Sequence, residues 1–300
     1  MPIAAPETKT AVCLPSPPSS NKLPFVIFLM KEGFYAISSE NVREIVILPA
    51  VVPVPNMPPE IRGVINLRGK VVPLIDLRLK LGLPSAKADL NDLIQLLRDR
   101  EQDHHNWLTE LEACVRERRP FKMARDPHAC KFGLWYDKFQ TDNSLLKMSL
   151  KKMNEPHQLI HAAADEVLRL VEAGDTAGAT KLLALRRNRE LAELSKLFEE
   201  SRRILVEHHR ELAVVLVRGE KRFAISIDQV EAVERIPEQN IEPLPGSMAG
   251  QTENHSWRIG KRIKTNQTIL LLDETFLFSS DAIDSIPTRP PRVPAVTAPA

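Results

Sequence analysis

The string FYAISSENV at residues 34–42 recurs as RFAISIDQV at residues 222–230, 188 positions further along the chain. The Ala-Ile-Ser triplet and the valine four residues after its serine occupy the same places in both copies. At the same offset, Leu48-Pro49 corresponds to Ile236-Pro237. Any two hairpins can share a short string, but the shared order of hairpin, triplet, valine and proline-containing return favours a duplicated β unit. Two related halves are expected to pack together as one domain.

Strand-like runs surround both copies of the repeat. In the first half, PFVIFLM, KEG and FYAIS predict one hairpin, and GVINLR, GK and VVPLID predict another. In the second half, the same interpretation applies to LAVVLV, RGE and KRFAIS, and to WRIGKRI, KTNQ and TILLLD. The many β-branched residues and prolines favour the short strands of small barrels. Residues 24–84 and 210–279 are therefore expected to form one discontinuous β domain.

The intervening residues 86–209 have helical periodicity, with apolar residues recurring every three or four positions. Asn91 or Asp92 is expected to open the first helix, and Pro120 follows its end. Gly174 and Asp175 should end one helix and cap the next. Three long helices and a short one around Cys130 predict a four-helix bundle. As an inserted domain, this bundle should have its two ends close together.

Composition limits the class of protein. With 41 basic and 39 acidic residues, the formal charge is +2, which gives no reason to expect a nucleic acid or an anionic membrane as partner. No apolar run reaches the about 18 residues of a membrane span, so direct membrane insertion is not expected. Residues 1–23 and 280–300 predict disordered tails, and the prolines of the first exclude a signal-peptide core. Three cysteines do not make a disulfide framework, which indicates a reducing cytoplasm.

Histidines and one cysteine stand out in the helical stretch. The strings DHHNWLTEL, DPHACKFGLWYD and NEPHQLIHAAA contain His104, Cys130, His157 and His161. His157 and His161 are four residues apart and share one apolar helix face. Three imidazoles and one thiolate complete a tetrahedral zinc shell with no position left for water. Such a closed shell is typical of a structural or sensing site rather than a catalytic one.

Each of these residues has a simpler explanation when it is taken alone. A lone histidine on an apolar face is more often a satisfied core residue, and Cys130 could be a small buried hydrophobe. Three inward imidazoles without a shared partner would nevertheless be costly to desolvate, and a metal removes that cost. Periodicity favours His104 over its neighbour His105 as the inward ligand. His128, two residues before Cys130, is a competing ligand.

The helical stretch resembles the chemoreceptor zinc-binding, or CZB, domain. The family pattern H-x-x-W, C-x-x-G-x-W and H-x-x-x-H is matched in full, and Trp107, Gly133 and Trp135 complete it around the four candidate ligands. The resemblance implies a bundle that binds one Zn²⁺ per chain through the three histidines and the cysteine. It also implies sensing of zinc, or of oxidants that attack the zinc-bound thiolate. The two tryptophans are expected to pack near the ligands and exclude water.

The flanking segments resemble the CheW-like domain, which couples chemoreceptors to the histidine kinase CheA. The strings FYAISSENVREIVIL, IRGVINLRGKVVPLIDLRLKLGL and FAISIDQVEAV carry the resemblance. It implies receptor contacts at Asn66 and Arg68, and a CheA-facing groove that includes Val42 and Glu44. From the sequence alone, Arg68 could equally be a turn residue and Val42 a core residue. IGKRIKTNQ, at residues 259–267, is more charged than the glycine-rich equivalent of the family.

Together these patterns predict an α+β multidomain protein, a CheW-like double five-stranded β-barrel interrupted by an antiparallel four-helix bundle. The predicted function is a cytoplasmic adaptor, recruited to chemoreceptor arrays, that joins a chemoreceptor signalling tip to the regulatory domain of a CheA-type kinase. Zinc or oxidant sensing in the bundle would modulate this coupling. The alternative is a constitutive scaffold whose zinc is purely structural. No enzymatic activity is expected, because Gln158 stands where an H-E-x-x-H site would have glutamate and no nucleotide-binding or hydrolase string occurs.

Overall fold

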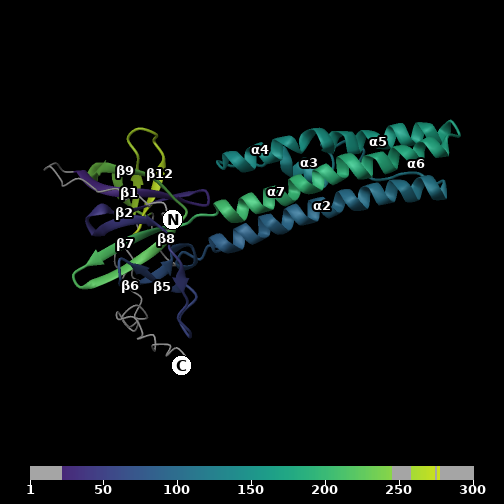
Figure 1. Ribbon diagram of the computed structural model, residues 1–300. Helices are drawn as coiled ribbons and strands as arrows, with labels where there is room; N and C mark the ends of the chain where they lie inside the picture. The colour runs from purple at the N-terminus through teal and green to yellow at the C-terminus, as the bar shows by residue number, and fades with distance from the viewer. Residues whose placement is uncertain (1–21, 245–257, 274–275, 278–300) are drawn as a thin grey trace, which may run out of the picture. The chain divides into compact units, whose positions relative to one another are not determined.

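A computed structural model describes residues 22–244, 258–273 and 276–277 (Figure 1). The chain forms two compact units. The first, called here the β unit, combines the residues up to Ala86 with those from Arg210 onwards. The second, the helical unit, is Lys87–His209. The predicted tails lie outside the described residues, except that the first strand already begins at Lys22.

Within the described residues, each segment of the β unit contributes six strands in the same order. The first segment forms β1 (Lys22–Met30), β2 (Gly33–Ser38), β3 (Val42–Ile47), β4 (Val51–Val52), β5 (Ile61–Leu67) and β6 (Lys70–Asp76). The second forms β7 (Leu212–Arg218), β8 (Lys221–Ile227), β9 (Gln229–Pro237), β10 (Ile241–Pro243), β11 (Arg258–Lys261) and β12 (Thr268–Leu271). The predicted hairpins β1–β2, β5–β6, β7–β8 and β11–β12 all occur.

The two segments exchange strands. One six-stranded sheet has the order β10-β11-β12-β2-β1-β9, and the other has the order β3-β7-β8-β6-β5-β4. Replacing each strand of one sheet by its counterpart in the other segment reproduces the other sheet in reverse order. Even the register of the parallel contacts agrees, because Leu271 pairs with Ala36 and Leu74 pairs with Ala224. The fold is therefore a duplication in which neither half forms its sheet alone.

Repeated positions also play the same part in the core. Val26 and Val214 are both fully buried, as are Ala36 and Ala224, and each pair is separated by 188 residues. The structure confirms a mixed α+β architecture with two sheets and helices. Among the described residues, each sheet has six strands, with the short strands β4 and β10 at the edges, and the two five-stranded barrels stay a prediction.

The helical unit has three long helical stretches. These are α2 (Ala86–Glu117), then α4 (Ser144–Lys152) followed by α5 (Asn154–Glu172), then α6 (Thr176–Arg186), a π-helical turn (Arg187–Leu191) and α7 (Ala192–His208). The short α3 (Lys131–Tyr136) follows Cys130, and a single turn, α1 (Leu77–Lys80), follows β6 in the β unit. Among the described residues, no helix combines the length and the apolar character needed to span a membrane.

The helix boundaries correct one prediction and support another. Asn91 and Asp92 lie inside α2 rather than at its start, because Ala86–Leu90 are mostly strong helix formers that extend the helix toward Pro84. Asp175 does cap α6, since its side chain accepts a hydrogen bond from the amide of Gly178 at 2.8 Å. A break at Met153 separates α4 from α5, so both histidines of α5 belong to a new helix.

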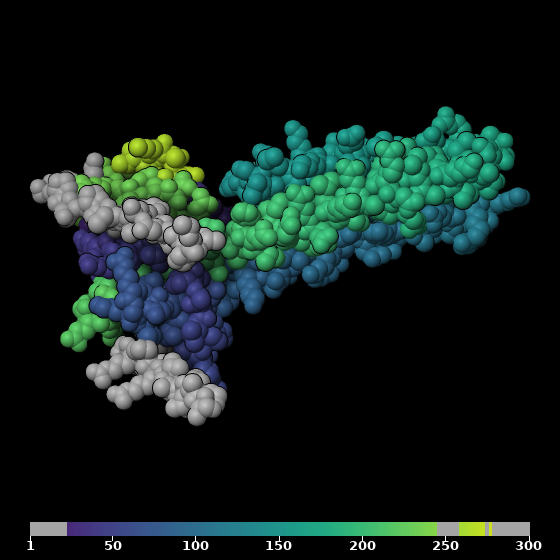
Figure 2. All heavy atoms as spheres, in the orientation of Figure 1, coloured from purple at the N-terminus to yellow at the C-terminus, as the bar shows by residue number. Residues whose placement is uncertain are grey.

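Helices α2 and α7, the first and last of the helical unit, lie side by side, as Figures 1 and 2 show. Arg202 of α7 donates to Glu101 of α2 at 2.6 Å. Near the end of the unit, Ile94 of α2 and Val206 of α7 line the same hollow. The helical unit therefore begins and ends at the same end, as an inserted domain requires.

Candidate metal centre

Three elements of the helical unit bring four potential metal ligands together. His104 lies in α2, Cys130 immediately precedes α3, and His157 and His161 lie one turn apart on α5. One ligand atom of each residue lies within 4.8 Å of the ligand atoms of the other three. The fold thus places all four predicted ligands in a single cluster that can hold a metal ion.

The orientation of His104 is set by its own helix. Its Nδ1 donates a hydrogen bond to the carbonyl oxygen of Arg100 at 2.6 Å. Because the proton is on Nδ1, Nε2 has a free lone pair, and Nε2 is buried without any hydrogen-bonding partner. A backbone carbonyl on the other ring nitrogen is the usual way in which proteins orient a metal-binding histidine.

The other two histidines are also held in the neutral form. Burial, reinforced by the neighbouring histidines, lowers the pKa of His157 to about 2 and that of His161 to about 4. The backbone at Ala124 and Arg125 offsets part of the shift at His161, yet neither of its ring nitrogens has a well-formed hydrogen bond. Burial lowers the pKa of His104 as well. Neutral imidazoles with unpartnered nitrogens are the form in which histidine binds metals.

The fourth member, Cys130, is the N-cap of α3. Its Sγ accepts a hydrogen bond from the amide of Gly133 at 3.2 Å and lies 3.2 Å from Nε2 of His157. Burial raises the pKa of the thiol, while the amides of Gly133 and Phe132 oppose that rise. Glycine is required at position 133, because a Cβ atom there would lie 2.0 Å from the carbonyl oxygen of Pro127.

Aromatic side chains enclose the cluster. Phe132 stands edge-on to His157 at 4.9 Å, and Trp107 lies 4.8 Å from His161, both measured between ring centroids. Trp107 is fixed by a hydrogen bond from Nε1 to the carbonyl of Ala124 at 2.7 Å. Trp135 packs one layer further out, against Phe132. Trp107 thus contacts a candidate ligand directly, whereas Trp135 contacts the cluster only through Phe132; that the two tryptophans exclude water stays a prediction.

One side of the cluster is open. A hollow reaches it from the surface and is lined by Asp103, His104, Trp107, Met123, Ala124, Ala129, Cys130, Lys131, Phe132 and His161. Cys130 is only partly buried, whereas the three histidines are at most 4% exposed. Small reagents can therefore reach the thiol without unfolding of the helices.

The competing ligands lie elsewhere. Nε2 of His105 is 3.0 Å from the hydroxyl of Ser195 on α7. His128 is exposed and its Nδ1 lies 2.9 Å from a carboxylate oxygen of Asp137, which raises the pKa of the imidazole. Neither belongs to the cluster. Three imidazole nitrogens and one sulfur form a donor set that fits zinc.

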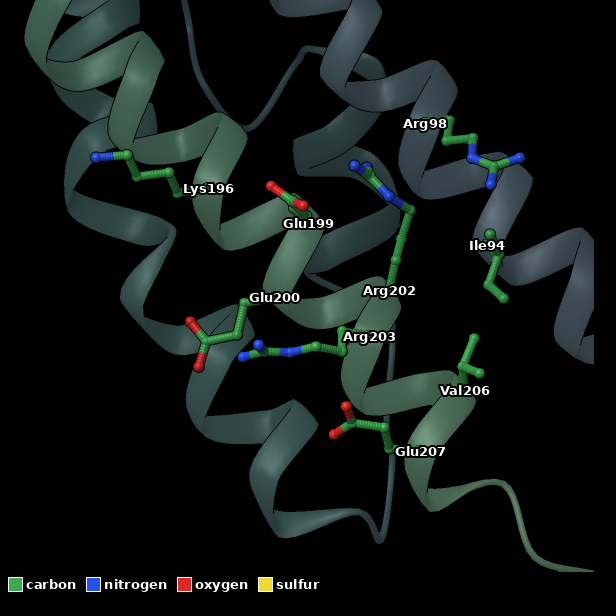
Figure 3. Close-up of a pocket in the computed structure, with 9 residues that line it drawn as sticks. All are labelled: Ile94, Arg98, Lys196, Glu199, Glu200, Arg202, Arg203, Val206 and Glu207. Atoms are coloured by element: carbon green, nitrogen blue, oxygen red, sulfur yellow. The ribbon is translucent and has the colours of Figure 1, made fainter.

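A second hollow lies on the outer face of the helical unit, between α2 and α7 (Figure 3). It is lined by Ile94, Arg98, Lys196, Glu199, Glu200, Arg202, Arg203, Val206 and Glu207. These side chains are mostly charged and of both signs, and they include no histidine or cysteine. This hollow is the solvated face of two neighbouring helices and has no donor set of its own.

The partner-binding residues predicted in the β unit form one group. Arg68 lies in the two-residue turn between β5 and β6, with φ angles of 54° at Arg68 and 79° at Gly69. Its guanidinium pairs with Glu44 of β3 at 3.1 Å, while 76% of its side chain remains exposed. The side-chain oxygen of Asn66 accepts from the amide of Gly69 at 2.9 Å. Val42 is 9% exposed and belongs to the core of the β unit.

Two features of these sites could not be read from the sequence. Arg68 and Glu44 are predicted as contacts for different partners, although the structure joins them in one ion pair. The ring of Phe198 on α7 lies 6.2 Å from that of His104. Helical periodicity places apolar residues on one face of a helix but does not indicate which side chains of another helix they meet.

Comparison with known proteins assigns the two regions. Residues 24–104 match the CheW-like domain family, and residues 104–168 match the chemoreceptor zinc-binding domain family. The chain therefore combines a CheW-like region with a CZB region, as the resemblance predicted. Residues 210–273 lie beyond both matches, but their strands complete the same two sheets.

Three curated relatives are called chemotaxis protein CheW. That of Helicobacter pylori is 36% identical over 94 residues, which are 31% of this chain and 57% of the relative. That of Bacillus subtilis is 46% identical over 59 residues, 20% of this chain and 38% of the relative. The Klebsiella aerogenes protein is 38% identical over 73 residues, 24% of this chain and 44% of the relative. The chain thus spans about half the length of these relatives.

A solved structure was also compared. The scaffolding protein TtCheW from Thermoanaerobacter tengcongensis aligns over 87% of this chain and 95% of its own, with 15% identity and a TM-score of 0.41.

Proposed function

We propose that this protein is a chemotaxis adaptor that joins a chemoreceptor signalling tip to the regulatory domain of a CheA-type histidine kinase. The match of residues 24–104 to the CheW-like domain and the relatives named CheW support this role. In this proposal the protein acts in the cytoplasm at chemoreceptor arrays, holds its partners together and performs no catalysis. Arg68, Asn66 and Glu44 contribute the receptor and kinase contacts, with Val42 supporting them from the core.

We further propose that the helical unit binds one Zn²⁺ per chain through His104, Cys130, His157 and His161. The observation that carries this proposal is the convergence of four donor atoms within 4.8 Å, including buried imidazole nitrogens that lack any other partner. Bound zinc would keep the thiol deprotonated and would join α2, α3 and α5. Loss of zinc, or oxidation of the partly buried Cys130, would release this junction and change the adaptor's coupling.

A constitutive scaffold with a purely structural zinc ion is the second candidate. Its supporting observation is the complete four-residue donor set inside an aromatic core, which suits a permanent structural site. The two candidates differ in whether the metal state changes partner binding.

The test is a binding titration with a chemoreceptor tip fragment and with the kinase regulatory domain. It is run on the zinc-loaded protein, on the chelated protein and on the protein treated with hypochlorous acid. Regulation predicts that zinc removal changes affinity about tenfold, a typical coupling between two sites. Equal affinities in all three states would leave the structural-zinc scaffold. Failure to bind either partner in any state would refute the adaptor role itself.

A further inference from the structure

The chain returns from the helical unit to the β unit through three residues. Helix α7 ends at His208 and strand β7 begins at Leu212. The last connecting residue, Glu211, is fastened to the β unit in two ways. Its carboxylate pairs with Arg62 of β5, and its carbonyl oxygen accepts from the amide of Leu48 at 2.9 Å. Glu211 is therefore held firmly to the β unit at the start of β7.

Both attachments lead to the Arg68–Glu44 pair. Arg62 lies on β5, the strand that runs directly into the turn containing Arg68. Leu48 directly follows β3, which contains Glu44. Strand β7, which starts one residue after Glu211, pairs along β3 and places Val215 opposite Glu44. Glu211 is thus linked through Arg62 to the strand that precedes Arg68, and through β7 to the strand that contains Glu44.

The other connection between the units is fastened elsewhere. Arg78 of α1 donates to the carboxylate of Asp228, between β8 and β9, and to the carbonyl oxygen of Pro84 just before α2. Arg78, Asp228 and Pro84 all belong to the β unit, and Asp228 lies between strands that do not contain Arg68 or Glu44. The two connections are thus fastened by different groups, although the outgoing one also follows β6, the strand that begins just after the Arg68 turn.

We infer that Glu211, through its pair with Arg62, is a positioning residue that transmits the state of the helical unit to the Arg68–Glu44 face. This inference rests on the proposed function in so far as that face binds a partner. Glu211 itself has no need to touch the partner, because it acts through the strands that carry Arg68 and Glu44.

The surroundings of Arg62 allow a clean test. Asp76, whose side chain is 4% exposed, lies 4.0 Å from the same guanidinium. Two carboxylates therefore share one arginine, and removal of one leaves Arg62 with the other as partner. Glu211→Gln is expected to fold, because no buried charge loses all its partners. Arg62→Lys provides a second variant, since lysine keeps the charge but loses the fork that can bind both carboxylates.

The experiment measures amide hydrogen exchange in the full-length protein, zinc-loaded and after zinc removal with EDTA. In the wild type, zinc removal should speed exchange about tenfold in β3 and in the turn at Asn66–Gly69. In Glu211→Gln and Arg62→Lys, that zinc-dependent change should fall below about twofold. Glu211→Asp, which retains the charge, should recover part of it. Glu220→Gln is the matched control, because it removes an exposed carboxylate at the far end of β7 and should behave like the wild type.

Two results would overturn the inference. One is a wild type whose β3 and turn do not respond to zinc. The other is a zinc response in Glu211→Gln and Arg62→Lys as large as in the wild type. Binding of a chemoreceptor tip fragment is measured in parallel. A zinc response that is present in the wild type and lost in Glu211→Gln and Arg62→Lys, together with no binding of the fragment, would support the inference and contradict receptor binding by the Arg68–Glu44 face.

Discussion

The two units bury polar side chains in opposite ways. In the helical unit, His104 and His161 lie within an aromatic core and present ring nitrogens that have no hydrogen-bonding partner. In the β unit, the side chain of Arg262 is 6% exposed, yet it donates to Glu234, Glu231 and Gln267. An unsatisfied buried polar group costs about 1–3 kcal/mol. The histidine cluster therefore favours binding of a metal ion to its free nitrogens, whereas the Arg262 group already has its hydrogen-bonding partners.

The same contrast occurs between the repeated halves of the β unit. Arg262 follows β11 and pairs with β9, and Arg68 follows β5 and pairs with β3, the equivalent strand of the other half. The side chain of Arg262 is 6% exposed, and that of Arg68 is 76% exposed. The turn that contains Arg262 is thus closed by internal pairing, whereas most of the Arg68 side chain stays accessible. Under the proposed function, this accessible side chain is the one available to a partner.

The strongest test of this contrast removes a histidine or the cysteine from the unpartnered cluster. Cys130→Ser and His161→Ala should each lose bound zinc almost completely, with an affinity at least ~100-fold lower, because zinc needs the full donor set. Elemental analysis of the purified variants checks this. His105→Ala, which changes the neighbouring imidazole, should keep about one zinc per chain. Full occupancy in either ligand variant would show that the metal is held elsewhere.

The second test removes Arg262 from its hydrogen-bonded group with Glu231, Glu234 and Gln267. Arg262→Met should lower the free energy of unfolding by about 1–3 kcal/mol at neutral pH, because Glu231 and Glu234 lose a charged hydrogen-bonding partner. Arg258→Met, an exposed change at the start of β11, should alter it by less than about 0.5 kcal/mol. Chemical denaturation of all three proteins provides the measurement.

The pH dependence of that difference has a definite sign. Arg262 lowers the pKa of Glu234 below its ordinary value of 4.5. A carboxylate whose pKa is lower in the folded state stabilises the protein above pH 4.5 and loses this contribution as the pH falls through the folded pKa. The gap between wild type and Arg262→Met should therefore shrink below pH 4.5. A gap that grows with acidity would contradict the pairing.

The sequence predicts these sites unevenly, for physical reasons. The 188-residue repeat reveals the strands and their equivalent buried positions, because local pattern and burial go together. The exchange of strands between the halves was not predictable. The pairing of Leu271 with Ala36 joins strands far apart in the sequence, and neither local pattern specifies its partner strand. The metal cluster was predictable because three histidines and one cysteine at this spacing are rare in one short stretch. The Arg68–Glu44 pair was not, because its distance depends on how the sheet curves.

The third test asks whether the β unit folds without the helical unit. Replacing residues 86–209 by a short Gly/Ser linker should leave a folded protein, because both sheets are built entirely from strands outside that range. Circular dichroism should show strand signal and a cooperative thermal transition. An unfolded product would show that the helical unit stabilises the β unit directly, and would weaken the comparison of two self-sufficient regions.

The smallest expected effect on stability is at Arg68, and it is the most informative for function. Arg68→Ala removes one exposed ion pair, which typically contributes about 0–1 kcal/mol, so the melting temperature should stay within a few degrees. Loss of an interfacial arginine commonly weakens binding by about 2 kcal/mol or more, so affinity for a chemoreceptor tip should fall at least about tenfold.

Arg68→Asn is the matched variant, because asparagine suits the positive φ of 54° at this turn. It should be at least as stable as the wild type and bind as weakly as Arg68→Ala. Binding within about twofold of the wild type in both variants would remove Arg68 from the interface, and a collapse in the stability of Arg68→Ala alone would make it a turn residue. Stable variants with weak binding would instead show that the exposed Arg68 serves partner binding, whereas Arg262, at the corresponding place in the other half, serves stability.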